Sequence, residues 1–217
     1  MYRRVAGALF FYFSVIFYAS LAMAEPLMIG EFSENNLHGW EEKIFEGKTA
    51  YSIVNLAGKD VLVAESHAAA SGLFRKITVD LNKTPYINWS WRAENVLPGI
   101  NEKTKAGDDY PARIYMVSSG GVFFWKTKAV NYVWSSNQVP DDAWPNAYTS
   151  RAHMVVVESG NSNIAKWRNY KRNVREDFQR FFAKDVSEID VVAVMTDTDN
   201  SGLSAKTYYG DIYFTSD

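Results

Sequence analysis

The sequence contains no cysteine among its 217 residues. This absence excludes disulfides, thiolate metal sites, a cysteine nucleophile and the lipid-modified cysteine of a lipoprotein. The stability of the fold must therefore come from burial rather than from covalent or thiolate cross-links.

Basic charge is also scarce. The 23 Lys and Arg residues are outnumbered by 25 Asp and Glu residues, which gives a formal net charge of −2. Because no basic stripe is available to neutralise phosphates, the composition predicts that nucleic acid is not a partner. Neither the Gly-x-Ser-x-Gly turn of a serine hydrolase nor a phosphate-binding Gly-Lys motif occurs, so the common hydrolase and nucleotide-binding classes are disfavoured.

Only one long apolar run is present, and it lies at the N-terminus. Arg3 and Arg4 precede an uncharged, mostly apolar stretch at 5–21, and Ala22-Met23-Ala24 has the small-x-small form of a signal peptidase site. We predict a signal peptide over residues 1–24, a single domain over 25–217, and a periplasmic or secreted protein. An uncleaved anchor is the alternative, because residues 5–24 would just cross a bilayer. No second apolar span follows, so the mature chain is expected to have no transmembrane segment.

Beyond the leader, short segments of alternating polarity are separated by turn residues. Trp89 and Trp91 share one face of an extended segment at 86–92, and the segments 51–56 and 61–66 flank a turn containing Gly58. About a dozen such segments without strand–helix alternation predict an all-β fold, a two-sheet antiparallel β-sandwich.

One helix is expected, between residues 173 and 182. Apolar residues recur there at helical spacing, Asn173 can act as N-cap, and Glu176 stands three residues later, as in a capping box. The longest stretch without a predicted element, residues 94–109, reads as a mobile surface loop that could close over a site.

The candidate site begins near the C-terminus, where an apolar strand at 191–195 runs into Thr196-Asp197-Thr198-Asp199-Asn200. Asp197 and Asp199 project from one face of an extended chain about 7 Å apart, a spacing that suits a cation or a polar ligand. With Asp211 nearby in sequence, they form the best calcium candidate, although the spacing matches no EF-hand loop. The adjacent pairs Asp108-Asp109 and Asp141-Asp142 are oxygen-rich as well.

Arg113 and Tyr115 share one face of another predicted strand. An arginine inside a strand needs a partner. It can pair with Asp197 or Asp199 and only fasten two strands, or it can hold a carboxylate, a phosphate or a sugar hydroxyl in an open cleft. Trp134 is equally ambiguous between a core residue and a stacking platform. The predicted ligand-binding residues are therefore Arg113, Tyr115, Trp134, Asp197 and Asp199.

Several segments together carry a family resemblance. They read Asp-Asp-Tyr-Pro-Ala-Arg-Ile-Tyr at 108–115, Asn-Tyr-Val-Trp at 131–134, Asn-Ala-Tyr-Thr at 146–149, Arg-Asn-Val at 172–174, Met-Thr-Asp-Thr-Asp-Asn at 195–200 and Tyr-Gly-Asp-Ile at 209–212. The chain resembles an exported bacterial family known as domain of unknown function 3047. The resemblance implies secreted or periplasmic proteins without an assigned activity, so it carries over no catalytic residue. By analogy with chains that open near a Gly-Trp and close on a Gly-Asp-Ile strand, it implies a jelly-roll sandwich similar to carbohydrate-binding modules.

Three functions are consistent with these residues. The first is a cell-envelope binding protein that takes a carbohydrate or another polar small ligand, with calcium as a candidate cofactor. The second is a glycan-acting hydrolase or lyase that uses Asp197 or Asp199 as acid or base. The third is a structural envelope protein without a ligand, in which Arg113, Asp197 and Asp199 form a buried network with every partner inside the chain.

Overall fold

The computed structural model describes residues 25–120 and 126–217. The predicted signal peptide, 1–24, lies outside the described residues. Within them, no helix is both long and apolar enough to cross a membrane.

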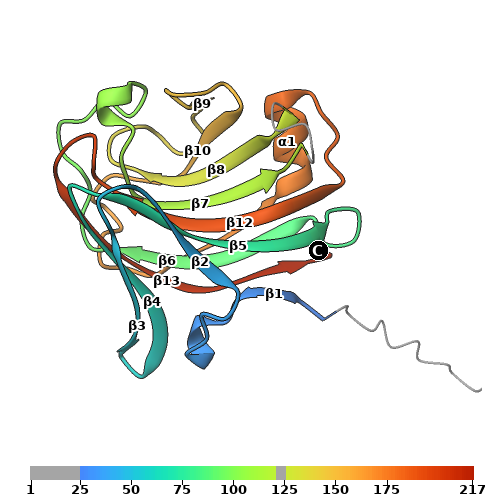
Figure 1. Ribbon diagram of the computed structural model, residues 1–217, viewed down its shortest axis with the longest axis horizontal. Helices are drawn as coiled ribbons and strands as arrows, with labels where there is room; N and C mark the ends of the chain where they lie inside the picture. The colour runs from blue at the N-terminus through green and yellow to red at the C-terminus, as the bar shows by residue number, and fades with distance from the viewer. Residues whose placement is uncertain (1–24, 121–125) are drawn as a thin grey trace, which may run out of the picture.

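The described strands form two sheets that lie face to face (Figure 1). The six-stranded sheet contains β1 (Leu27–Gly30), β3 (Ala50–Leu56), β4 (Lys59–His67), β6 (Tyr86–Ala93), β11 (Arg168–Asn173) and β13 (Ser204–Thr215). The seven-stranded sheet contains β2 (Trp40–Glu46), β5 (Ala70–Asp80), β7 (Tyr110–Ser118), β8 (Lys128–Ser135), β9 (Ala143–Pro145), β10 (Ala152–Ser159) and β12 (Glu188–Asp197). The predicted all-β sandwich is confirmed.

The strand order explains which segments become neighbours. The six-stranded sheet runs β11-β6-β13-β4-β3 with β1 beside β13, and the seven-stranded sheet runs β2-β5-β12-β7-β8-β10-β9. All described pairs are antiparallel except β8 with β10, which are parallel. Strand β12 therefore lies between β5 and β7 in the seven-stranded sheet, whereas its sequence neighbour β13 belongs to the six-stranded sheet that faces it.

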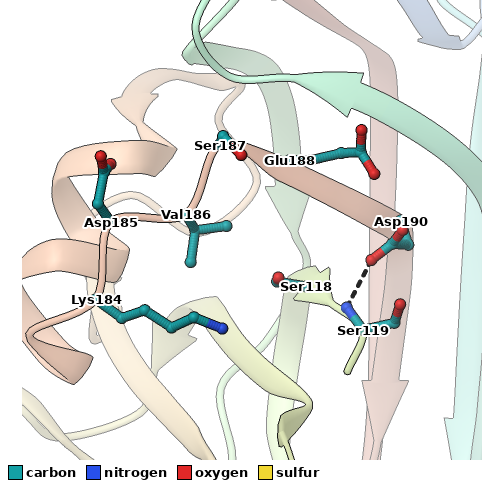
Figure 2. Close-up of a pocket in the computed structure, with 8 residues that line it drawn as sticks. All are labelled: Ser118, Ser119, Lys184, Asp185, Val186, Ser187, Glu188 and Asp190. Carbon is teal, nitrogen blue, oxygen red and sulfur yellow. Dashed lines mark hydrogen bonds between the residues drawn. The ribbon is translucent and has the colours of Figure 1, made fainter. Parts of the chain in front are cut away.

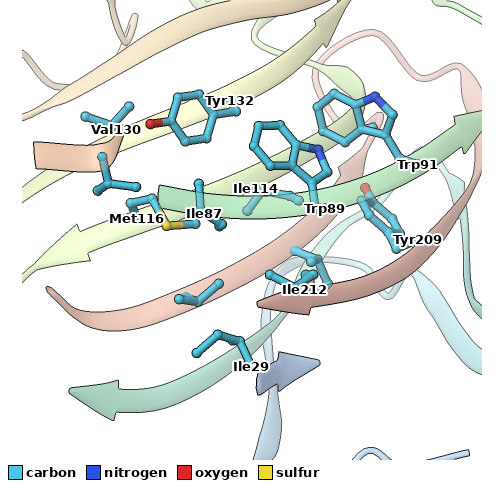
Figure 3. Packing of buried hydrophobic residues seen from close by; sticks show 14 of the residues in the cluster. Ile29, Ile87, Trp89, Trp91, Ile114, Met116, Val130, Tyr132, Tyr209 and Ile212 are labelled. Carbon is cyan, nitrogen blue, oxygen red and sulfur yellow. The ribbon is translucent and has the colours of Figure 1, made fainter. Parts of the chain in front are cut away.

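Aromatic side chains fill the space between the sheets. Trp89, Trp91 and Tyr209 come from the six-stranded sheet and meet Tyr132 and Ile114 from the other (Figure 3). Trp89 stacks on Tyr132 with ring centroids 5.2 Å apart. Since each buried aromatic ring removes a large apolar area from water, this layer contributes much of the stabilisation of a fold that has no disulfide.

The predicted helix is confirmed as α1 (Val174–Phe182), at one end of the sandwich. The Asn173 side chain caps it by accepting from the backbone N–H of Glu176. Its buried Asp177 accepts a hydrogen bond from the Tyr132 hydroxyl at 2.7 Å, which ties the helix to β8. Two 3₁₀ turns, η1 (Phe32–Glu34) and η2 (Lys105–Gly107), complete the described helical elements.

Three edge strands and one loop differ from expectation. β2 and β11 were not predicted, because both are polar and largely exposed and so lack an apolar alternation, and the edge strand β9 was missed because it is only three residues long. The segment 94–109 is not a free surface loop. Leu97 and Glu102 are fully buried in it, and the Glu102 carboxylate accepts from the Ser135 hydroxyl and the Ser136 N–H. Burial raises the pKa of Glu102 despite these hydrogen bonds.

Candidate functional site

A pocket of about 560 Å³ lies on the face of the seven-stranded sheet that points away from the core. The alternation that turns Ala112 and Ile114 inward turns Arg113 and Tyr115 outward. Met195 of β12 lies directly opposite Arg113 in the antiparallel register, so both strands contribute to the pocket floor. β2 and the 146–149 segment contribute its walls.

Arg113 is the centre of this floor. Its Nη2 lies 2.7 Å from Asp197 Oδ2, and its Nη1 donates to the Tyr115 hydroxyl at 2.7 Å. The guanidinium also donates to the backbone carbonyl of Asp108 and lies over the Tyr110 ring, 4.2 Å from its centroid. The predicted pairing of Arg113 with a C-terminal acid is confirmed, and it joins the neighbouring strands β7 and β12.

Four acids surround the arginine. Carboxylate oxygens of Asp109, Asp197 and Asp199 all lie within 4.8 Å of one another. Asp108 lies beside them, with Oδ1 3.7 Å from Arg113 Nη2 and Oδ2 accepting from Asn146 Nδ2 at 2.7 Å. The cluster therefore holds more negative charge than the single guanidinium can balance.

The turn after β12 is built so that its acids face the pocket. Thr198 turns the other way: its N–H donates to the Ala69 carbonyl at 2.9 Å, and its hydroxyl lies 2.8 Å from the Ser66 hydroxyl. Gly202, at φ +69°, closes the turn by donating to the Thr198 carbonyl. Asp197 and Asp199, on either side of Thr198, both line the pocket.

Electrostatics inside the cluster follow from burial. Burial raises the pKa of Asp197 well above its ordinary value; Arg113 opposes this effect, and the carboxylates of Asp109 and Asp108 add to it. Burial, together with Asp109, also raises the pKa of the half-buried Asp199. Burial and the neighbouring carboxylates therefore outweigh the stabilisation that Arg113 gives to the ionised forms of these two acids.

The polar network is incomplete. Asp108 Oδ1, Asp197 Oδ1 and Arg113 Nε are buried and have no hydrogen-bond partner among the described residues. Buried polar atoms in folded proteins are nearly always hydrogen-bonded. The purely structural alternative required burial with every partner inside the chain; Arg113 and Asp197 meet the first condition, at 4% and 2% exposed, but not the second.

Two aromatic side chains stand at the pocket rim. Phe45 of β2 is 53% exposed and Tyr148 is 56% exposed, and both line the pocket. Neither was predicted as a site residue. Tyr148 lies in one of the segments that carry the family resemblance, whereas Phe45 sits in a charged edge strand that gives no sequence signal.

Two predicted site residues lie elsewhere. Trp134 pairs with Ala112 across β7 and β8, so its side chain faces the core, is fully buried and donates from Nε1 to the Gly160 carbonyl. Trp134 is therefore a core residue, and its prediction as a ligand platform is wrong. Asp211 belongs to β13 in the opposite sheet and accepts from the backbone N–H and the hydroxyl of Ser33. It cannot join Asp197 and Asp199, and Asp109 takes its place in the cluster.

A second pocket, of about 310 Å³, lies beside the segment that leads into β12 (Figure 2). Apart from Val186 it is lined by polar and charged side chains, and Asp190 accepts from the Ser119 N–H there at 2.6 Å. None of its described side chains has a buried polar atom without a partner. The pocket around Arg113 is therefore the stronger candidate.

Solved structures similar to this chain share little sequence with it. Cellulose induced protein Cip1 has a TM-score of 0.48 at 10% identity, over 87% of this chain and 96% of that one. TmCBM61, solved in complex with β-1,4-galactotriose, has a TM-score of 0.44 at 12% identity, over 87% and 95% of the two chains. The CBM22-2 xylan-binding domain of Xyn10C from Paenibacillus barcinonensis has a TM-score of 0.42 at 11% identity, over 87% and 98%.

No curated protein matches the sequence significantly. The family model described as "Protein of unknown function (DUF3047)" matches residues 38–213, which include every residue of the pocket. The chain belongs to this family.

Proposed function

We propose that the protein is an exported cell-envelope binding protein that holds a carbohydrate, or another hydroxyl-rich polar ligand, in the pocket around Arg113. One observation carries the proposal: exposed aromatic rings at the rim stand above buried carboxylate oxygens that lack hydrogen-bond donors. Sugar hydroxyls supply such donors, and the apolar faces of sugar rings pack on aromatic side chains. The export half of the proposal depends on the predicted signal peptide.

The charge of the pocket favours a neutral ligand. Arg113 is the cation at the floor, and Asp197 and Tyr115 already occupy its guanidinium. An incoming phosphate or carboxylate would meet the carboxylates of Asp108, Asp197 and Asp199, which line the pocket beside that guanidinium. A neutral glycan, which brings only donors and acceptors, avoids this repulsion.

A non-catalytic role fits the acids better than hydrolysis does. Asp197 is buried and bound to Arg113, and both oxygens of Asp109 already accept hydrogen bonds from Asn200 and Ser201. Within the three-carboxylate cluster, Asp109 and Asp197 are buried, and Asp199 is partly exposed. A glycosidase needs two available carboxyl groups across a cleft.

Glycan binding to the purified protein tests the proposal. Calorimetric titration against a panel of neutral envelope glycans should show binding, and Phe45→Ala or Tyr148→Ala should each weaken it by about 1–3 kcal/mol, roughly 5- to 150-fold. Trp167→Ala is the matched control, because Trp167 is also an exposed aromatic, at 37%, but lies outside the pocket. The proposal fails if no glycan binds, or if Trp167→Ala costs as much as the rim variants. Release of new reducing ends from a bound glycan would replace the binding role with the hydrolase alternative.

A further inference from the structure

The three-carboxylate cluster has the dimensions of a cation site. Asp109 comes just before β7, Asp197 ends β12 and Asp199 follows in the turn, yet their oxygens lie within 4.8 Å of one another. Two oxygens on opposite sides of one calcium ion are separated by roughly 4.6–5.2 Å, twice the usual Ca–O distance, whereas the smaller shell of Mg²⁺ allows only about 4.2 Å. The upper limit of 4.8 Å falls within the calcium range.

An unpartnered atom gives independent evidence of a missing ligand. Asp197 Oδ2 contacts Arg113, but Oδ1 has no hydrogen-bond partner among the described residues, and the side chain is only 3% exposed. A buried carboxylate oxygen without a donor carries a large desolvation cost. A cation that Asp197 binds through this oxygen would remove that cost.

The carboxylates are also held in place without a cation. Asp109 Oδ1 accepts from the N–H and the Nδ2 of Asn200, and Oδ2 accepts from the Ser201 N–H at 2.6 Å. The inward anchoring of Thr198 fixes the intervening turn. Hydrogen bonds of this kind orient carboxylate ligands in metal sites, so little ordering would be required on binding.

We propose that Asp109, Asp197 and Asp199 bind one divalent cation of the calcium type. The donors are all oxygen, which selects hard cations, and three carboxylates can be completed by waters to the six to eight oxygens that calcium takes. Because Asp197 and Asp199 line the pocket, a bound ion would present free coordination positions to it. Sugar hydroxyls can fill those positions, a step that rests on the proposed glycan binding, whereas cation binding itself does not.

The test uses the purified protein stripped with a chelator. Titration with CaCl₂, MgCl₂ and MnCl₂ should show one calcium site per chain that is tighter than the magnesium site, and the melting temperature should rise with calcium concentration by mass action. Asp199→Asn should weaken calcium binding at least tenfold; Asp199 lies in the turn and forms no ion pair among the described residues, so its variant should fold. Tb³⁺ luminescence sensitised by the nearby tyrosines, and its displacement by Ca²⁺, provides a second readout.

Asp141→Asn is the matched control. Asp141 also belongs to a run of adjacent acids, its side chain is 79% exposed, and its φ of +69° suits asparagine equally well. The cation site would be overturned if the two variants bound calcium with equal affinity. It would also be overturned if the protein bound no calcium and Asp199→Asn, in chelator, melted at a higher temperature than the unsubstituted protein. Calcium binding without any glycan binding would instead refute the proposed function alone. Glycan binding that persists unchanged in chelator would refute only the bridging step.

Discussion

Removal of the Arg113 guanidinium should be among the most damaging single changes in this chain. Arg113→Met keeps an unbranched side chain in the pocket floor but deletes the contact with Asp197 Oδ2 at 2.7 Å and the hydrogen bond to Tyr115. Asp197, 2% exposed, would then remain buried beside Asp109 and Asp199 without a cation from this chain.

The size of the effect follows from burial. Breaking a buried ion pair by removing one partner typically costs about 3–5 kcal/mol, because the other charge stays uncompensated. In a domain of this size each 1 kcal/mol lowers the melting temperature by about 2–4 °C, so we expect a fall of roughly 6–20 °C. Urea unfolding should give the free energy directly, through a lower midpoint at an unchanged slope.

A second arginine–aspartate ion pair allows the contribution of burial to stability to be separated from that of contact geometry. Arg175 contacts Asp185 through two hydrogen bonds of 2.6 and 2.8 Å, a geometry at least as good as that of Arg113, but its side chain is 39% exposed. Arg175→Met should leave the melting temperature almost unchanged, since exposed pairs contribute little. If Arg113→Met and Arg175→Met prove equally mild, burial is not what gives the Arg113 pair its importance.

The double variant Arg113→Met/Asp197→Leu completes the argument. Replacement of both members of a buried pair by apolar side chains is often neutral or stabilising. The double variant should therefore recover more than half of the stability lost in Arg113→Met. A double variant that is no more stable than the single one would refute the claim that the uncompensated Asp197 charge causes the loss.

Two further predictions concern residues outside the pocket. Burial and the nearby Lys128 lower the pKa of His153 in the folded state. Because the unfolded state then binds the proton more readily, the free energy of unfolding should rise with pH up to about 6.5 and stay level above it. His153→Gln should reduce the difference between the urea midpoints measured at pH 5 and pH 7.5. If that difference is the same in the variant, other groups cause the pH dependence. Tyr132→Phe removes the 2.7 Å hydrogen bond to Asp177, which Arg172 still contacts, and should cost about 1 kcal/mol in urea unfolding. A stabilised variant would show that the hydroxyl is dispensable.

The elements that could be predicted from the sequence are those whose pattern is local. The alternation around Trp89 and Trp91 depends on one strand with one buried face. The helix at 174–182 is indicated by the N-cap residue Asn173 and by the helical spacing of its apolar residues. β2 and β11 carry no such pattern, because an edge strand with exposed side chains is held mainly by the backbone hydrogen bonds of its neighbour.

The sequence predicted a site contact only where one charged side chain required a partner of opposite charge. Arg113 inside an apolar strand required an acid, and Asp197 met that requirement. Trp134 could not be placed in the same way. Whether its side chain shares the Arg113 face or the Ala112 face depends on the register between β7 and β8, and a shift of one residue would exchange the two. The prediction of Asp211 as a metal ligand was wrong for a related reason. Asp211 is close to Asp199 in sequence, but the chain crosses to the other sheet between them.

The gathering of four acids is a consequence of strand order. β7 and β12 are antiparallel neighbours, so the beginning of one lies beside the end of the other, and Asp197 pairs with Tyr110. The acids that precede β7 therefore meet those that end β12. A purely structural fastening of the two strands needs one acid that contacts Arg113, and Asp197 provides it. Asp109 joins the start of β7 to the turn after β12 through Asn200 and Ser201, but Asp199 forms no ion pair among the described residues and adds a carboxylate that the fastening does not use. That surplus carboxylate is the group that the proposed cation or hydroxyl-rich ligand would contact.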